Sequence, residues 1–196
     1  MNKQIVLVIG GPGKSGSTTI AKMLSEYFQI EMVSGGSLFR SEAKRKGFSS
    51  LTEYLSQMST SEVMEFDKVV DNKLREYAKR DNVLIESKVF AGITTKEDID
   101  CSAKVWLKRG LGVRVKRAIG KENIKNPILK FLKKIEIKKN LIKRYNVDKS
   151  RYRELYGIEY DAPEKYNDLV IDSSEQNPEE TFNLIINFLK NSMVGK

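Results

Sequence analysis

A glycine-rich loop between an apolar run and an amphipathic segment constrains this chain more than any other feature. The aliphatic and β-branched residues at 4–9 predict a strand, and glycines follow it at once. Beyond the loop, Ile20, Met23 and Leu24 recur at helical spacing. A strand, a glycine loop and a helix form the arrangement in which backbone N–H groups and a helix N-terminus surround one anion. The sequence therefore predicts a phosphate-binding loop.

The spacing within this loop follows a known phosphate-loop pattern, in which glycine, four residues and a second glycine precede lysine and a hydroxyl residue. Gly11 and Gly16 are the two glycines, and Thr18 occupies the hydroxyl position that binds magnesium. Ser17 stands where the lysine is expected, and Lys14 within the loop is a candidate to replace its charge. A glycine-rich turn in another kind of α/β protein is the alternative. The candidate nucleotide-binding residues of the loop are Gly11, Pro12, Gly13, Lys14, Ser15, Gly16, Ser17, Thr18 and Thr19.

Length and composition indicate one globular domain. The chain has 196 residues, of which 40% are hydrophobic and 31% charged, which is enough for one well-packed core and short for two. The apolar run near the N-terminus is too short to cross a bilayer, and no signal peptide is recognisable. Cys101 is the single cysteine and cannot form an intramolecular disulfide. We therefore expect a cytoplasmic protein that does not bind membranes.

The chain contains no histidine, which is the commonest general base. Its chemistry must then rely on positioning, charge and metal, as phosphoryl transfer does. The net charge is +9, and residues 104–153 hold 18 Lys or Arg against three acidic residues. Such a block could bind nucleic acid or a small anion, but few aromatic residues interleave it for stacking bases. We interpret it as a solvated face with a phosphate-binding subset.

Apolar runs and helical patterns alternate along the chain, which predicts an α/β protein with a parallel five-stranded sheet flanked by helices. Ligands of such sheets bind at the carboxyl ends of the strands. Ser37 is the expected N-cap of the second helix, and Thr60 or Ser61 that of a longer one. After the first strand we expect strands at 30–33, 83–85, 103–107 and 169–171, and helices at 38–47, 51–58, 60–80, 121–156 and 178–189.

Charged residues outside the loop lie near these strand ends. Arg40 suits a phosphate on a second substrate, or is a surface arginine. Glu86 ends an apolar strand, where a carboxylate could join a magnesium shell, and Lys88 points to the same side. Asp67 and Asp71 could contact sugar hydroxyls or a base amine, and a solvated helix edge is the equal alternative.

Arg144, Asp148 and Arg151 share one face of an expected helix, which places two guanidinium groups around a carboxylate. Spacing alone favours a surface ladder of salt bridges, which is common on charged helices. A phosphate site is the alternative.

Several segments together resemble the nucleoside-monophosphate kinases, most closely the short archaeal cytidylate kinases, over nearly the whole chain. The most specific segment is Arg-Tyr-Arg-Glu-Leu-Tyr-Gly-Ile at 151–158, which precedes Asp-Leu-Val-Ile-Asp at 168–172. The other matching segments are Val-Ser-Gly-Gly-Ser-Leu-Phe-Arg at 33–40, Phe-Asp-Lys-Val-Val-Asp at 66–71, Asn-Val-Leu-Ile-Glu-Ser-Lys at 82–88 and Lys-Val-Trp-Leu-Lys at 104–108.

This resemblance implies that a monomer transfers the γ-phosphoryl group of ATP to CMP or dCMP with Mg²⁺, nucleic acid being a less favoured partner. It implies one kinase domain over 1–196, with a nucleoside-monophosphate-binding segment at about 37–80 and a lid at about 110–156. The candidate catalytic residues are Lys14, Arg144 and Arg151. By resemblance, Arg114 and Arg117 join the loop in binding ATP; Ser34, Ser37, Arg40, Asp67, Asp71, Lys88, Arg144, Asp148 and Arg151 bind the acceptor; and Thr18 and Glu86 bind the metal.

Four positions and one stretch depart from the family pattern: Ser17 stands at the loop lysine, and residues 121–143 are richer in lysine than expected. Ser37 replaces an acid, Ser87 a glycine and Lys88 an arginine, and a lysine cannot bind phosphate with two parallel hydrogen bonds as arginine does. A kinase of another small acceptor, or a non-catalytic nucleotide- or RNA-binding protein on the same fold, therefore stays open.

Overall fold

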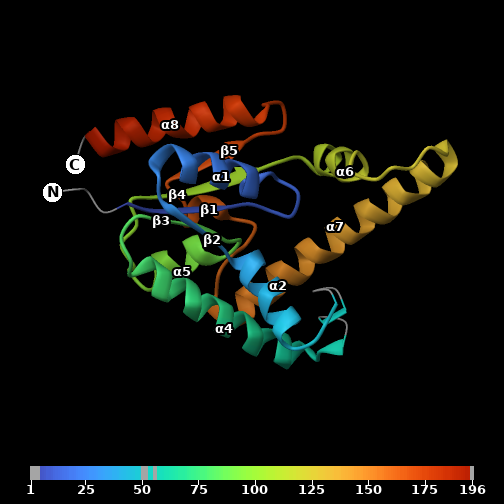
Figure 1. Cartoon of the computed structure of the whole chain (residues 1–196), viewed down its shortest axis with the longest axis horizontal. Coiled ribbons are helices and arrows are strands. Elements are labelled where there is room, and N and C mark those ends of the chain that lie inside the picture. The colour runs from blue at the N-terminus through green and yellow to red at the C-terminus, as the bar shows by residue number, and fades with distance from the viewer. Residues whose placement is uncertain (1–4, 50–52, 55–56, 195–196) are drawn as a thin grey trace.

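A computed structural model describes residues 5–49, 53–54 and 57–194. Its centre is a five-stranded parallel sheet with the strand order β2-β3-β1-β4-β5 (Figure 1). Because every expected strand is present, the predicted fold class is confirmed. The strands are β1 (Val6–Gly10), β2 (Glu31–Ser34), β3 (Val83–Glu86), β4 (Ala103–Lys108) and β5 (Leu169–Asp172).

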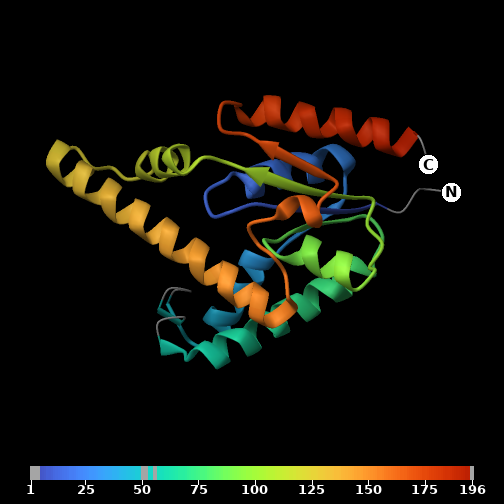
Figure 2. The same ribbon diagram turned by 180° about the vertical axis from the view of Figure 1, so that it is seen from behind.

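Helices cover both faces of the sheet. One face carries α1 (Ser17–Phe28) and α8 (Pro178–Val194), and the other carries α4 (Thr60–Ala78) and α5 (Phe90–Lys96), as Figures 1 and 2 show. The residues of β1 explain this arrangement, because successive side chains point to opposite faces of the sheet and pack in two different cores. Val6 and Val8 pack with α4 and α5, whereas Leu7 and Ile9 pack with α1 and α8. A strand buried on both faces reads as a continuous apolar run.

Two further groups of helices extend from the carboxyl edge of the sheet. On one side α2 (Gly35–Arg45) packs against α4, where Ala43, Phe66 and Val70 form a small separate core. On the other side α6 (Leu111–Ile119) packs along α7 (Pro127–Tyr156), and the two form an arm that projects from the sheet (Figure 2). A short 3₁₀ helix (Pro163–Lys165) leads from α7 to β5.

The arm is built on one helix of 30 residues, in agreement with the continuous helix expected up to Gly157. Asn126 caps its N-terminus and Pro127 stands in its first turn, where proline is tolerated. Gly157 ends it with a φ of 61°, a left-handed conformation that favours glycine. No helix in the described part of the chain is both long and apolar enough to cross a bilayer.

Two predicted helix caps are wrong. Ser34, not Ser37, caps α2, because the Ser34 hydroxyl accepts a hydrogen bond from the Ser37 N–H at 3.3 Å and the intervening glycines form the first helical turn. Ser59, not Thr60 or Ser61, caps α4 through a reciprocal capping box with Glu62.

One helix was missed and others differ in length. Helix α5 was not predicted, because a glycine and a β-branched run lower its helix propensity. Gly92 is needed there, since a Cβ would lie 2.6 Å from Ile158 Cδ1. The last helix runs to Val194 rather than to about 189. Part of the short helix expected at 51–58 lies outside the described residues.

Candidate functional site

Two glycines, Gly11 and Gly16, shape the loop between β1 and α1. A Cβ on Gly11 would lie 2.4 Å from Ser15 Oγ and 2.7 Å from the Leu107 carbonyl oxygen. Gly16 has a φ of 105° and is the N-cap of α1, where it has no side chain to cap the helix; the Ser17 N–H donates to Ser15 Oγ at 3.4 Å. The N-terminus of α1, with the partial positive charge of the helix dipole, can bind an anion at this edge of the sheet.

Lys14 occupies a strained position in the loop. It is exposed and has a φ of 68°, a left-handed conformation that a lysine adopts only at a cost of about 1–2 kcal/mol. Its assignment as the substitute for the missing loop lysine stays a prediction.

Three arginines lie against the loop from the side of the arm. Arg114, which burial gives a lowered pKa, donates from Nη1 to the Gly13 carbonyl oxygen at 3.2 Å. Arg117 Nη1 lies 3.1 Å from the point where a Cβ of Gly16 would stand, so both arginines predicted for ATP lie beside the loop. Arg109 Nη1 lies 3.6 Å from the same point. Arg109 is not among the predicted site residues, although its position just after β4, at the carboxyl edge of the sheet, was a usable signal.

Glu86 joins three elements at the carboxyl edge of the sheet. It accepts hydrogen bonds from Ser17 Oγ at 2.8 Å, from Thr18 Oγ1 at 3.3 Å and from Ser34 Oγ at 2.6 Å. A carboxylate and hydroxyl groups beside a phosphate loop are the oxygen ligands that suit Mg²⁺. No three acidic or cysteine side chains in the described residues are grouped to hold a metal alone, so these residues fit a magnesium ion that phosphates and water also coordinate.

A buried ionic cluster lies between β3, α4 and α7. Asp148 pairs with Lys88 and, at 3.1 Å, with Arg151 Nη2. Arg151 Nε also lies 2.9 Å from Asp67 Oδ2, although neither of these two atoms makes a well-aligned hydrogen bond. Because the Asp148 side chain is only 5% exposed, the surface ladder that spacing favoured is wrong. The cluster joins side chains from α4, from α7 and from the segment after β3, so it depends on tertiary packing and not on one helix.

Burial sets the protonation of the two α4 carboxyl groups. It raises the pKa of Asp67 to about 7, against the lowering effect of Arg151, and raises the pKa of Asp71 to about 6, against a hydrogen bond of 2.7 Å from the Tyr156 hydroxyl. The two side chains are 2% and 3% exposed, so a solvated helix edge is excluded. Near neutral pH they can both donate and accept hydrogen bonds.

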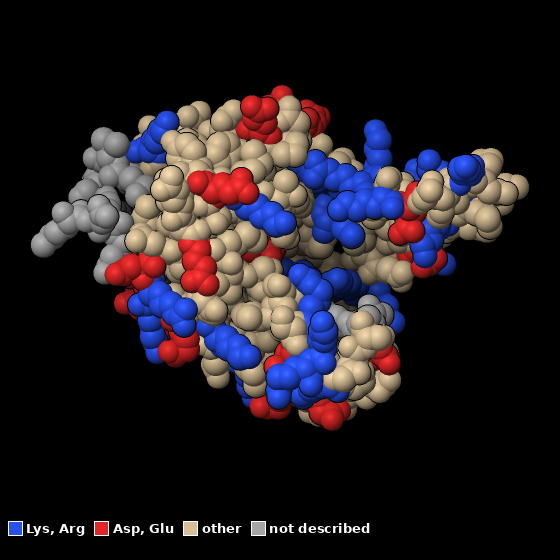
Figure 3. Space-filling model, in the orientation of Figure 1, with Lys and Arg blue, Asp and Glu red and all other residues tan. Residues whose placement is uncertain are grey.

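The remaining predicted acceptor residues lie on α2 and α7. Arg40 is exposed on α2, and its Nη1 lies 3.4 Å from the point where a Cβ of Gly36 would stand. Ser37 and Arg144 are also exposed. Burial lowers the pKa of Lys88, and the nearby positive charge of Arg144 lowers it further. Figure 3 shows a hollow between the arm and the α2–α4 part, bordered by Lys and Arg side chains.

The chain is similar to proteins of known family. Residues 9–126 match the model of an AAA domain. Over 189 residues the chain is 34% identical to a cytidylate kinase of Methanocaldococcus jannaschii, covering 95% of this chain and 98% of that protein. A cytidylate kinase of Staphylothermus marinus is 33% identical over 187 residues, covering 95% and 97%.

Solved structures share the fold at low identity. A shikimate kinase from Aquifex aeolicus has a TM-score of 0.60 at 19% identity, over 98% of this chain and 100% of that one. A shikimate kinase from Bacteroides thetaiotaomicron has a TM-score of 0.61 at 14% identity, over 95% and 99%. The loop, the sheet and these likenesses define a P-loop kinase. The chain belongs to the nucleoside-monophosphate kinase family, and within it resembles the archaeal cytidylate kinases.

Proposed function

We propose that the protein transfers the γ-phosphoryl group of ATP to CMP or dCMP, giving ADP and CDP or dCDP. One observation carries this proposal: Glu86, at the end of β3, accepts hydrogen bonds from α1 beside the phosphate loop and from β2, and Lys88, two residues further along the chain, pairs with Asp148 in the buried ionic cluster. A donor and an acceptor can therefore lie side by side at one edge of the sheet. The cytidylate kinases to which the chain is similar support the identity of the acceptor.

The donor and acceptor would be bound by different residues. The loop amides and the N-terminus of α1 would hold the phosphates of ATP. Arg40, Lys88, Arg144 and Arg151 would hold the acceptor phosphate and orient one of its oxygens towards the γ-phosphorus. Mg²⁺, held by Glu86 and Thr18, would neutralise charge on the phosphates.

The reaction needs positioning more than acid–base chemistry. An oxygen of the acceptor phosphate forms a bond to the γ-phosphorus while the bond from that phosphorus to the β–γ bridging oxygen breaks, and ADP leaves. The acceptor phosphate is already an anion, so no strong base is required, which agrees with a chain that has no histidine. Movement of the α6–α7 arm towards α2 would exclude water and prevent hydrolysis of ATP.

The α4 carboxyl groups suit a cytosine base. Its Watson–Crick edge carries an amine that donates beside a ring nitrogen that accepts. Asp67, with a pKa of about 7, and Asp71, with a pKa of about 6, can accept from the amine when ionised and donate to the nitrogen when protonated. Uracil presents the reverse pattern, a carbonyl that accepts beside a ring N–H that donates, which the same two carboxyl groups match with their roles exchanged, so UMP belongs in the substrate panel.

The proposal is tested by ADP release from Mg-ATP with CMP, dCMP, UMP, AMP and GMP, with shikimate and gluconate as acceptors of a different class. We expect turnover with CMP or dCMP. Arg144→Ala should lower kcat, whereas Arg153→Ala, which removes another exposed arginine of the same helix, should not. Absence of ADP above background with every nucleotide would refute the proposal, and steeply salt-dependent RNA binding would then favour an RNA-binding protein.

A further inference from the structure

Arg109 is buried beside the phosphate loop and only partly used by the protein. It is 7% exposed. Its Nε donates to Ser173 Oγ at 3.1 Å, and its Nη2 donates to the Ser173 carbonyl oxygen and, at 3.5 Å, to that of Gln176. These bonds hold the ends of β4 and β5 together. They also fix the guanidinium group in one orientation.

The third nitrogen of this guanidinium group, Nη1, donates no hydrogen bond to the described residues, although it is buried. It lies 3.6 Å from the point that a Cβ of Gly16 would occupy, and so faces the last residue of the loop. A buried donor without a partner is unfavourable, and more so when it is charged. An anion bound at the loop would supply the missing acceptor.

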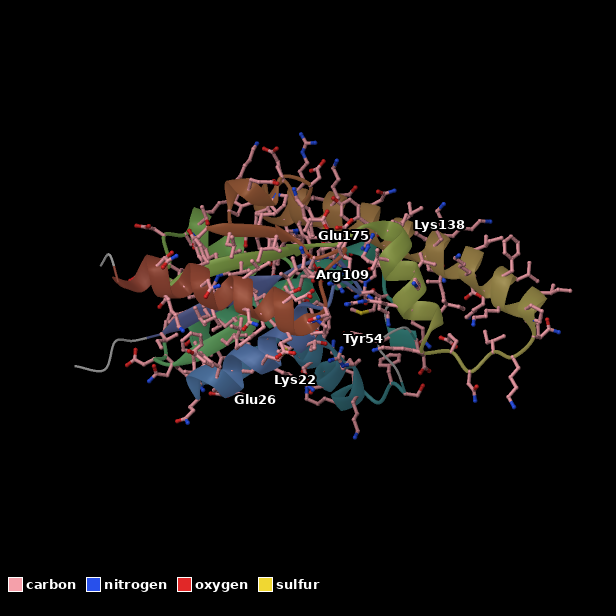
Figure 4. The ribbon with its side chains drawn as sticks, turned by 90° about the horizontal axis from the view of Figure 1, so that it is seen from above. Lys22, Glu26, Tyr54, Arg109, Lys138 and Glu175 are labelled. Atoms are coloured by element: carbon pink, nitrogen blue, oxygen red, sulfur yellow. The ribbon has the colours of Figure 1, made fainter. Side chains whose placement is uncertain are left out.

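The charges around the loop are also unbalanced. Arg109, Arg114 and Arg117 all lie against it, and no ion pair within the described ranges includes any of the three. Like charges gathered at one site attract a ligand of opposite sign. Figure 4 shows Arg109 where the sheet meets the arm, whereas Lys138 lies farther out on α7.

We propose that Arg109 binds the phosphate chain of the donor nucleotide through Nη1 and, together with Arg117, supplies the positive charge that Ser17 does not. The proposal rests on the proposed function, which identifies the donor as ATP. Arg109 is better placed than Lys14 for this role, because it is buried and already oriented by Ser173, so that little side-chain entropy is lost on binding. The exposed side chain of Lys14 would lose more conformational entropy on binding, because no hydrogen bond within the described residues fixes its orientation.

The test compares ADP with adenosine, because only ADP carries phosphates. Affinities for both are measured by calorimetry on the full chain for the wild type, Arg109→Gln and Arg109→Lys, with Arg80→Gln as an exposed control far from the loop. Since a hydrogen bond to a charged group contributes about 1.5–3 kcal/mol, Arg109→Gln should weaken ADP binding about 10- to 100-fold. It should change adenosine binding much less, and Arg109→Lys should restore part of the ADP affinity.

Two more variants separate phosphate binding from a structural role. Ser173→Ala removes the acceptor of Arg109 Nε and loosens the orientation of the guanidinium group; it should lower the melting temperature and weaken ADP binding less than Arg109→Gln does, with adenosine binding unchanged. Ser17→Lys, combined with Arg109→Gln, puts a lysine at the position that the loop pattern expects. This double variant should recover ADP affinity if the new lysine and Arg109 neutralise the same negative charge on the phosphates.

The outcomes distinguish the two proposals. If Arg109→Gln leaves ADP binding unchanged, or weakens ADP and adenosine equally, Arg109 does not bind phosphate and the inference is wrong. If the wild type binds ADP with the expected effect of Arg109→Gln but phosphorylates no nucleotide, the inference stands and the proposed function fails. If the wild type binds no ADP, both are refuted.

Discussion

Removing Arg151 should destabilise the protein in a way that depends on pH. The side chain is 14% exposed and lies 2.9 Å from Asp67 and 3.1 Å from Asp148. Breaking a buried pair by removing one partner costs about 3–5 kcal/mol, because the other charge stays buried alone. Arg151→Met should therefore lower the free energy of unfolding by about that amount at alkaline pH, where Asp67 is ionised.

The sign of the pH effect follows from the raised pKa of Asp67. Its folded-state pKa is about 7 and its ordinary value 3.8, so the folded state binds the proton more tightly. The contribution of Asp67 to the free energy of unfolding is therefore largest at a pH below its ordinary pKa. This contribution is lost as the pH rises through about 7. Below that pH Asp67 is neutral and needs Arg151 less, so the variant should lose only about 1–2 kcal/mol.

Urea unfolding followed by circular dichroism, at about pH 5.5 and about pH 8.5, measures both values. Arg153→Met, an exposed arginine on the same helix, is the matched control and should change stability little at either pH. Adding Asp67→Asn to Arg151→Met should recover much of the loss at alkaline pH, because no buried charge then remains at that position. An equal loss at both pH values, or a double variant as unstable as the single one, would refute the reasoning.

Three further predictions concern the loop and its surroundings. Glu86→Gln should lower kcat and raise the Mg²⁺ concentration needed for half-maximal rate, since an ionised oxygen ligand is lost; an unchanged magnesium titration would contradict the proposed metal site. Lys14→Gly should relieve the left-handed strain and raise the free energy of unfolding by up to about 1 kcal/mol, with kcat retained; a large fall in kcat would instead assign the missing charge to Lys14. Gly11→Ala should abolish ADP binding or folding, because its Cβ would lie 2.7 Å from the Leu107 carbonyl oxygen; ADP calorimetry and circular dichroism would detect either.

Local signals account for the parts of the fold that were predicted. The strand at Val83–Glu86 is a short apolar run after a turn, and α7 ends at a glycine; both features lie within a few residues. The errors arose where the same short segment is compatible with two local structures. Gly35 and Gly36 are typical of a turn, yet the Ser34 side chain caps a helix that begins with them. Spacing alone could not decide between these alternatives.

The residues of the candidate site likewise fall into those that contiguous sequence predicted and those whose role depends on distant segments. The phosphate loop was recognisable because its glycines, hydroxyl residue and flanking elements are contiguous. For Asp148 the same reasoning favoured a solvent-exposed ladder, since its tertiary partner Lys88 lies 60 residues away on another element. Arg109 was passed over because its importance depends on the loop, Ser173 and Gln176 meeting around it.

By itself the sequence determined the parallel α/β class, the loop and the family resemblance, because each rests on periodicity or on a motif of adjacent residues. Only the tertiary structure decided which charged residues are buried and which cations surround the loop. Burial depends on what distant segments pack against a side chain, and it is burial that raises the pKa of Asp67 and leaves Arg109 Nη1 without a partner among the described residues.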